Sequence, residues 1–248
     1  AEEFGTHDKA VSCMDVNETH GLLVTGGWDA IIRIWDQSDA PGQLPVHSLK
    51  VPERVYSLST VGDSIVAALA DRRFAIYDIR ELDSTKLDGV EPTQLRDSSL
   101  KYQIRCVRMM PSGSGFVAGS IEGRVAVEYI DMSSEAQSKK YAFRCHRQQV
   151  DGADVIYPVN AISFHPVHHT FATGGEDGTV CLWDGFNKKR IKLYPTYPTS
   201  VSAVGFNCDG TLLAVASSYT YAQGEKEHPK DQIFVRTIGE NEAKPKAK

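Results

Sequence analysis

The segment KKYAFRCHR, residues 139–147, places a thiol, an imidazole and a guanidinium next to one another at Cys145, His146 and Arg147. A cysteine beside a histidine suggests a nucleophile and its base, which must lie within hydrogen-bond reach. If a strand continues through this segment, neighbouring side chains point to opposite faces and the pair cannot work as a dyad. Arg147 fits another chemistry, because a guanidinium makes bidentate contacts with carboxylates and phosphates.

Two other segments could carry chemistry. His165, His168 and His169 have ligand side chains, but FHPVHHT reads as a hairpin turn, and no carboxylate or thiol is placed to complete a metal shell. PSGSGF at 111–116 leads into a strand and lacks the lysine of a phosphate-binding loop. The chain has no CxxC pair that would indicate a structural zinc site. We expect no catalytic residue, no cofactor and no metal.

A repeat positions these residues. VTGGWDAIIRIWD at 24–36 aligns with ATGGEDGTVCLWD at 172–184, and each has an apolar strand-like stretch upstream. Alternating apolar positions bounded by Gly/Asp turns predict strands joined by tight turns. Weaker copies begin near residues 54, 105 and 201. Strand-closing positions recur every 40–55 residues, which is the spacing of four-stranded propeller blades. The sequence therefore predicts an all-β propeller with about five visible blades.

The Trp-Asp endings and the Gly-Gly-x-Asp turns resemble WD40 repeats over nearly the whole chain. The resemblance implies that His7, Thr25, Asp29 and Trp35 form a hydrogen-bonded network that joins a turn to its strands. Thr173, Asp177 and Trp183 repeat this network in the later copy, without a clear histidine. A structural role is expected for all of these side chains, because buried polar groups need partners.

Connections that exceed what a blade needs are the candidates for function. Residues 145–160 link an outer strand to the next inner strand, 219–232 form a polar insertion, and Trp28 occupies a turn where a small residue would suffice. In WD40 geometry both kinds of connection reach one face. A basic and aromatic face there would suit an acidic peptide, since Trp and Arg are enriched in interface hot spots.

A more specific resemblance rests on seven blocks: SSLKYQIRCVR (98–108), SIEGRVAVEYID (120–131), KKYAFRCHR (139–147), YPVNAISFHPVHHTFATGG (157–175), FNKKR (186–190), YPTSV (197–201) and EHPKDQIFVR (227–236). Together they resemble the WD40 spindle-checkpoint family named for budding uninhibited by benzimidazole, its third member. SIEGRVA and CHR are shared with the related messenger-RNA-export factors, which bind a nucleoporin. The last three blocks favour the checkpoint family.

The resemblance implies a noncatalytic scaffold of the spindle assembly checkpoint. Its partners would be checkpoint kinases carrying an acidic Gle2-binding sequence, and a kinetochore scaffold phosphorylated on Met-Glu-Leu-Thr motifs. Arg147 matches the peptide-binding position, with Arg105, Trp28 and Lys188 as expected companions. A nucleoporin-binding export factor is the alternative, and a propeller hydrolase is a remote one.

The same families have seven blades, so the resemblance implies a partial propeller over residues 1–238 that lacks the first two blades, followed by a polar tail at 239–248. The net charge of −5 argues against nonspecific nucleic-acid binding. No apolar run approaches the roughly 20 residues that a membrane helix needs. Five scattered cysteines suggest free thiols in a reducing compartment. We expect a nuclear and kinetochore protein with a cytoplasmic pool, bound to neither membrane nor nucleic acid.

Overall fold

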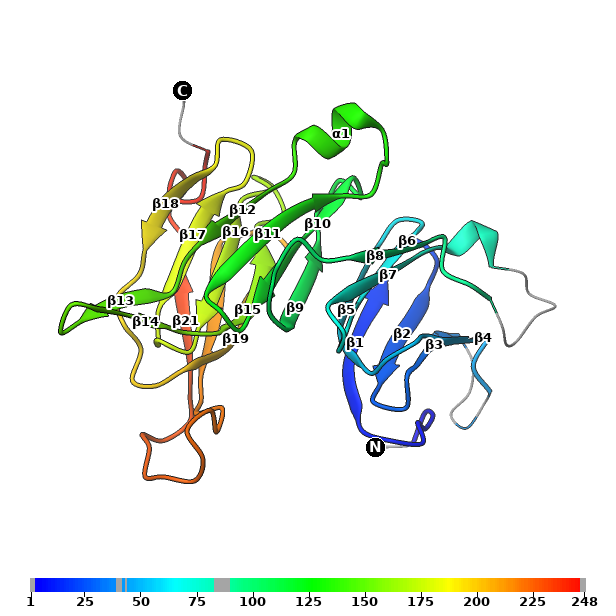
Figure 1. The fold of residues 1–248 in the computed structure, drawn as a ribbon, viewed down its shortest axis with the longest axis horizontal. Helices are drawn as coiled ribbons and strands as arrows, with labels where there is room; N and C mark the ends of the chain where they lie inside the picture. The colour runs from blue at the N-terminus through cyan, green and yellow to red at the C-terminus, as the bar shows by residue number, and fades with distance from the viewer. Residues whose placement is uncertain (1–2, 39–41, 43, 83–89, 246–248) are drawn as a thin grey trace. The chain divides into compact units, whose positions relative to one another are not determined.

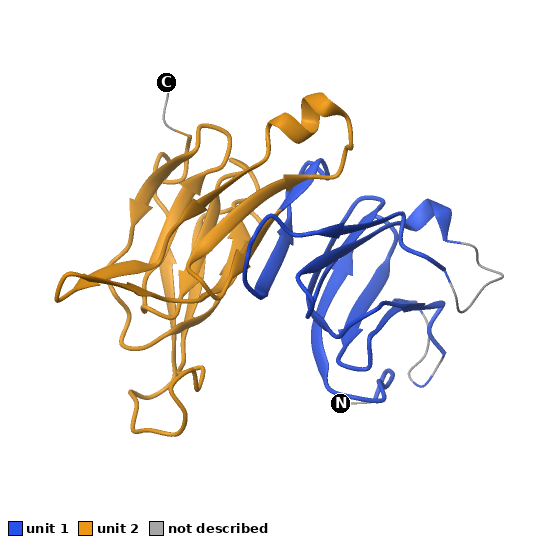
Figure 2. Cartoon of the chain, in the orientation of Figure 1, with its two compact units in different colours: residues 1–116 blue, residues 117–248 orange. Residues whose placement is uncertain are grey.

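The computed structural model describes residues 3–38, 42, 44–82 and 90–245 (Figure 1). By its internal contacts the chain divides into two compact units, residues 1–116 and residues 117–248 (Figure 2). The described residues are almost entirely strands and turns, and no helix among them is long and apolar enough to cross a membrane.

The first unit contains two complete antiparallel sheets, each with its four strands in chain order. The strands of the first are β1 (Val11–Asn17), β2 (Leu22–Gly27), β3 (Ile31–Asp36) and β4 (His47–Lys50). Those of the second are β5 (Val55–Val61), β6 (Ser64–Leu69), β7 (Arg73–Asp78) and β8 (Gln94–Asp97). A 3₁₀ turn, η1 (Ile79–Glu81), follows β7. Apolar side chains of both sheets form one buried cluster that includes Val24, Ile34, Leu58 and Tyr77.

A third sheet has the order β12-β11-β10-β9 and contains the boundary between the units. Its strands are β9 (Ile104–Met109), β10 (Gly115–Ser120), β11 (Arg124–Tyr129) and β12 (Tyr141–Arg144). A short helix, α1 (Ser134–Ser138), lies in the connection between β11 and β12, where Ser133 caps it by accepting from the Ala136 amide.

The second unit continues with a four-stranded sheet and a three-stranded one, again in chain order. The four strands are β15 (Val159–Phe164), β16 (Phe171–Gly175), β17 (Val180–Asp184) and β18 (Lys189–Leu193). The three are β19 (Val201–Phe206), β20 (Leu212–Ser217) and β21 (Gln232–Thr237). Val180, Leu182, Val201 and Leu213 are fully buried in their shared core.

The sheets repeat in detail as well as in order. In four of them the register between the first and second strand shifts after the first paired residue, at Val11, Val55, Val159 and Val201. A bulge at a fixed position bends each first strand in the same way. The predicted all-β repeat is confirmed, and the copies that begin near residues 54 and 105 each contain four strands.

The connection between the third and fourth sheets contains additional structure. Residues 147–156 of the predicted 145–160 link form a two-stranded hairpin, β13 (Arg147–Val150) and β14 (Ala153–Ile156). Within the predicted polar tail, Ala243 is buried and its carbonyl accepts from the Thr170 hydroxyl at 2.8 Å. Residues 246–248 of the predicted tail lie outside the described residues.

Candidate functional site

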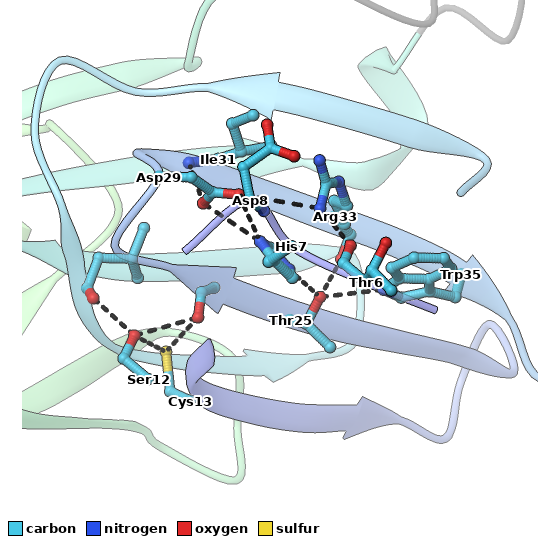
Figure 3. A network of polar contacts seen from close by, with 12 residues as sticks. Thr6, His7, Asp8, Ser12, Cys13, Thr25, Asp29, Ile31, Arg33 and Trp35 are labelled. Atoms are coloured by element: carbon cyan, nitrogen blue, oxygen red, sulfur yellow. Dashed lines mark hydrogen bonds and ion pairs between the residues drawn. The ribbon is translucent and has the colours of Figure 1, made fainter. Parts of the chain in front are cut away.

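A buried chain of polar contacts joins the turn after β2 to the strands of the first sheet (Figure 3). Trp35 Nε1 donates to Thr25 Oγ1 at 2.9 Å, and the same hydroxyl lies 2.8 Å from His7 Nε2. His7 Nδ1 lies 3.0 Å from the Asp29 carboxylate, which also accepts from the Asp8 and Ile31 amides. The structure therefore brings together all four side chains expected in this network, and each polar group has a partner.

The sheet β15–β18 carries the same chain of contacts, completed by a histidine that the sequence pattern did not reveal. Trp183 Nε1 donates to Thr173 Oγ1 at 2.9 Å. His146 Nε2 lies 2.9 Å from that hydroxyl, and His146 Nδ1 lies 2.9 Å from the Asp177 carboxylate. His146 comes from the segment before this sheet, 31 residues ahead of its aspartate, whereas His7 precedes Asp29 by 22.

His146 is therefore occupied structurally. An ionised carboxylate only accepts hydrogen bonds, so His146 Nδ1 carries a proton toward Asp177 and Nε2 accepts from Thr173. Burial raises the pKa of Asp177, but hydrogen bonds from His146 and Thr179 lower it by more, leaving it below the ordinary 3.8. Cys145 and His146 lie between β12 and β13, so the condition that a strand continues through them is not met, and the dyad is instead excluded by the partners of His146. His146 serves as a structural anchor because both of its ring nitrogens have partners.

The glycine pair of each repeat leaves room for this arrangement. A Cβ on Gly27 would lie 2.6 Å from His7 Nδ1, and one on Gly175 would lie 2.2 Å from His146 Nδ1. The preceding glycine faces the next sheet instead: a Cβ on Gly174 would lie 2.4 Å from Val201. None of these glycines has a positive φ, so backbone conformation does not require glycine there. Glycine is required because a Cβ atom would collide with the neighbouring side chain.

Arg147 follows the anchored histidine directly. The Cys145 amide donates to the Gly123 carbonyl at 2.9 Å, and an Arg147 terminal nitrogen donates to the Glu122 carbonyl at 2.9 Å. The segment is thus held by the β10–β11 turn on one side and, through His146, by the β16–β17 turn on the other. Among the described residues, the buried Arg147 Nε has no hydrogen-bond partner. A fixed guanidinium with an unused donor is suited to an anionic ligand.

Each sheet has two ends. We call the end where its first strand begins the entry end; in an antiparallel meander the turn between the second and third strands lies there too. Trp28 and Arg105 both lie at entry ends in the first unit and line one pocket of about 350 Å³ together with Val11, Tyr56 and Ile104. Arg54 lies over the Trp28 ring at 5.6 Å. This pocket combines aromatic surface with positive charge, as expected for these two residues.

Lys188 is placed differently from the other expected companions. It lies in the turn between β17 and β18, which is at the opposite end of its sheet from Asp177. Its ammonium group lies 4.6 Å from the centre of the Tyr141 ring. The structure therefore does not bring Lys188 together with Arg147, because a third-to-fourth-strand turn and an entry end are separated by the length of a strand.

The 219–232 insertion helps to line a second pocket of about 340 Å³ at the entry end of the second unit. Tyr219, Gln223 and Lys226 contribute from the insertion, and Gln148 contributes from the hairpin that Arg147 begins. Lys226 lies over the Tyr219 ring at 5.0 Å. Sequence reasoning named the insertion but not these side chains, which no motif distinguishes.

His165, His168 and His169 form a turn. His165 Nδ1 accepts from the Val167 amide at 3.2 Å and from the His168 amide at 3.1 Å, so the turn itself uses this lone pair. Burial, followed by the nearby His168, lowers the pKa of His165. Within the described part of the chain, no group of three or more His, Cys, Asp or Glu side chains is placed to hold a metal ion.

Comparison with known proteins agrees with the repeated sheets. The family model described as WD domain, G-beta repeat matches residues 2–36 and 140–184, and each match contains one of the two polar networks. The mitotic checkpoint protein BUB3.1 of Arabidopsis thaliana is 52% identical over 247 residues, covering 99% of this chain and 71% of that relative. This chain belongs to the Bub3 family of WD40 proteins.

Other relatives of this Bub3-family chain follow the same pattern. Mitotic checkpoint protein bub-3 of Caenorhabditis elegans is 44% identical, covering 98% of the chain and 70% of that protein. A poly(A)+ RNA export protein of Schizosaccharomyces pombe is more distant, at 33% identity over 100% of the chain and 68% of the relative. The names of the relatives support a mitotic checkpoint role for this Bub3-family chain.

A solved structure supports the fold alone. The β-propeller domain of Myceliophteria thermophila Cps50 (Swd1) has a TM-score of 0.66 to this Bub3-family chain at 14% identity, and the match covers 86% of this chain and 64% of that one.

Proposed function

We propose that this chain is a noncatalytic scaffold of the spindle assembly checkpoint that binds acidic peptide segments of its partners. The partners proposed are checkpoint kinases carrying a Gle2-binding sequence and a phosphorylated kinetochore scaffold. They would place the protein in the nucleus and at the kinetochore, with a cytoplasmic pool. Neither a membrane nor a nucleic acid is needed for this role.

The observation that carries the proposal is the geometry of Arg147. Its terminal nitrogen is tied to the Glu122 carbonyl, which fixes the guanidinium plane, while Nε remains a buried donor with no partner in the described residues. Arg147 as a whole is only half-buried, so a carboxylate or phosphate would contact the exposed part of its guanidinium group. His146 supports the site by holding the neighbouring residue in place.

The pocket lined by Trp28 and Arg105 supports the same function on the first unit. Trp28 is 43% exposed, so a large aromatic surface faces solvent beside the Arg54 and Arg105 guanidinium groups. An acidic peptide with an apolar residue would match both properties.

The test is titration calorimetry with a synthetic Gle2-binding-sequence peptide. Arg147→Glu should weaken the affinity by at least roughly 30-fold, because breaking a buried charge pair costs about 2 kcal/mol or more. Arg144→Glu is the matched control, since Arg144 is an exposed arginine on the adjacent strand β12. Equal affinities of the wild type and Arg147→Glu would refute the site, provided that both melt at the same temperature.

The export factor is the second candidate, because relatives named as RNA-export proteins are 33–34% identical to this chain. Pull-down from mitotic extracts separates the two proposals. Recovery of checkpoint kinases supports the scaffold, and recovery of a nucleoporin without kinases supports the export factor.

A catalytic role has little support in the side chains. Burial raises the pKa of the Cys13 and Cys181 thiols to about 11, so both are protonated near neutral pH and are poor nucleophiles. His146 is committed to Asp177 and Thr173. A broad screen of ester, peptide and phosphate substrates would reveal a propeller hydrolase if one were present.

A further inference from the structure

Two neighbouring turns of the second unit carry a cluster that the Arg147 site does not use. One is the β11–β12 connection, which contains α1, and the other is the β17–β18 turn; both appear at the upper end of this unit in Figure 1. Tyr141 joins them, because its hydroxyl donates to the Gly185 carbonyl at 2.5 Å and its ring lies 4.6 Å from the Lys188 ammonium. We call Lys139, Lys140, Tyr141, Phe186, Lys188 and Lys189 the basic–aromatic patch.

The patch is strongly positive for a chain of net charge −5. Its four lysines are all exposed. The acidic side chains nearby do not neutralise it: Glu135 pairs with Lys139 alone at 3.0 Å, and Asp131 accepts from Ser133. Asp184 is buried and is held by Asn187. Within the described residues Lys140, Lys188 and Lys189 form no ion pair, and a ligand of opposite charge would match them.

Phe186 adds an apolar element in the same turn as Lys188. It is 85% exposed, although burying its ring would be favourable by about 2 kcal/mol or more. A single exposed apolar residue is common, but here it lies beside lysines on a turn that is itself unusual. Lys188 has φ of +56°, a conformation that favours glycine or asparagine. Such outliers concentrate at binding sites, where the surrounding structure holds them.

We propose that the basic–aromatic patch is a second docking surface, for an acidic peptide segment that carries an apolar anchor residue. The lysines would contact the carboxylates, and Phe186 and the exposed edge of Tyr141 would cover the anchor. A peptide fits better than a nucleic acid or an anionic membrane, because Glu135 lies within the positive region and the charge is confined to four lysines. A phosphate backbone or a lipid surface would need a wider basic face.

This surface is independent of the Arg147 site. The β17–β18 turn lies at the opposite end of its sheet from the turn that holds His146, so one peptide strand could occupy each end. Lys188, which the sequence suggested as a companion of Arg147, is thereby assigned to a different surface. The second surface would let the scaffold hold two acidic segments at once.

The test uses the full 248-residue chain and two fluorescein-labelled peptides of equal charge, followed by fluorescence anisotropy. One peptide alternates Glu and Ser, and the other has a central Leu-Leu pair. The Leu-Leu peptide should bind more tightly, and Lys188→Glu/Lys189→Glu should weaken it by about tenfold or more at low salt. Phe186→Ser should remove the preference for the Leu-Leu peptide.

Matched controls separate this site from net charge and from misfolding. Lys50→Glu/Lys101→Glu makes the same charge change at exposed lysines of the first unit and should leave the affinity within about twofold. An equal loss in the Lys50/Lys101 variant, no preference for Leu-Leu, or tighter binding to duplex DNA or to phosphatidylserine vesicles would each overturn the proposal. Thermal melting shows that every variant is folded.

Discussion

His146 and Arg147 are neighbours in the chain but have different surroundings. His146 is buried and both of its ring nitrogens are bonded, while Arg147 is half-buried and is tied by one terminal nitrogen only. The left-handed backbone at His146, with φ of +47°, turns the chain between β12 and β13. At this scale His146 links the chain to Asp177 and Thr173, and Arg147, the proposed recognition residue, follows it directly.

His146→Ala should destabilise the protein by about 2–4 kcal/mol, because it removes two hydrogen bonds and leaves buried polar partners unsatisfied. Urea unfolding measures this change. His20→Ala is the control, because His20 also pairs with an aspartate, at 2.8 Å, but both side chains are about one-third exposed. It should cost no more than about 1 kcal/mol. Similar decreases in the free energy of unfolding of the two variants would show that the buried network stabilises the protein no more than an exposed pair does.

The Asp177 carboxylate predicts a particular acid dependence. Its folded-state pKa lies below 3.8, so the unfolded chain takes up this proton first as the pH falls. The stability it contributes is therefore complete above the unfolded pKa of about 3.9 and is lost as the pH falls through the folded value. Asp177→Asn should lower the free energy of unfolding at pH 7, and the difference from wild type should shrink below about pH 4. A difference that stays constant from pH 7 to about pH 3 would contradict this.

At the scale of the element, the Gly-Gly turn couples the sheet to the segment before it. Gly174 and Gly26 let the next sheet approach, and Gly175 and Gly27 let the histidine ring approach. The repeated sequence TGG is thus explained by two close contacts at the end of a strand, one with the next sheet and one with the histidine ring. Neither contact requires a positive φ at the glycine. The aspartate two residues after the second glycine, Asp29 or Asp177, then contacts the histidine for which that glycine leaves room.

Gly175→Ala should destabilise the second unit by about 1–3 kcal/mol through overpacking, because the new Cβ would collide with the His146 ring. It should also weaken the binding of acidic peptides, because Arg147 follows His146. Gly205→Ala on β19 is the matched control, since its Cβ would meet no atom within 4 Å. That variant should be neutral or stabilising by about 0.4–1 kcal/mol in thermal or urea unfolding. Equal stability of the two variants would contradict the role given to Gly175.

The sequence pattern identified the sheets because their turns and apolar alternation are local. It missed His146 because the histidine lies 31 residues before Asp177, against 22 in the first repeat, a difference of 31 − 22 = 9. The hairpin β13–β14 accounts for the added length, since it begins directly after His146. The match can be found in the alignment, because His146 aligns with His7 once nine of the ten residues 147–156 are treated as an insertion. Lys188 was misplaced because a motif does not indicate at which end of a sheet its turn lies.

At the scale of the whole molecule, the net charge is −5, but each of the two compact units has local surfaces with positive or aromatic side chains. The first unit contributes the Trp28 and Arg105 pocket, and the second contributes Arg147 and the basic–aromatic patch. Membership of the Bub3 family supports a checkpoint role. Recognition of acidic segments by these surfaces is our proposal, and it rests on their positive charge and aromatic side chains.

The most direct test is a double-mutant cycle between Arg147 and the acidic residues of a Gle2-binding-sequence peptide. Calorimetry would compare wild type and Arg147→Gln, each with the native peptide and with peptides in which one Glu is changed to Gln. We predict a coupling energy of about 1.5 kcal/mol or more for one of these glutamates, as for a close charge pair at an interface. A coupling within about 0.3 kcal/mol of zero for every glutamate would show that Arg147 does not hold the peptide.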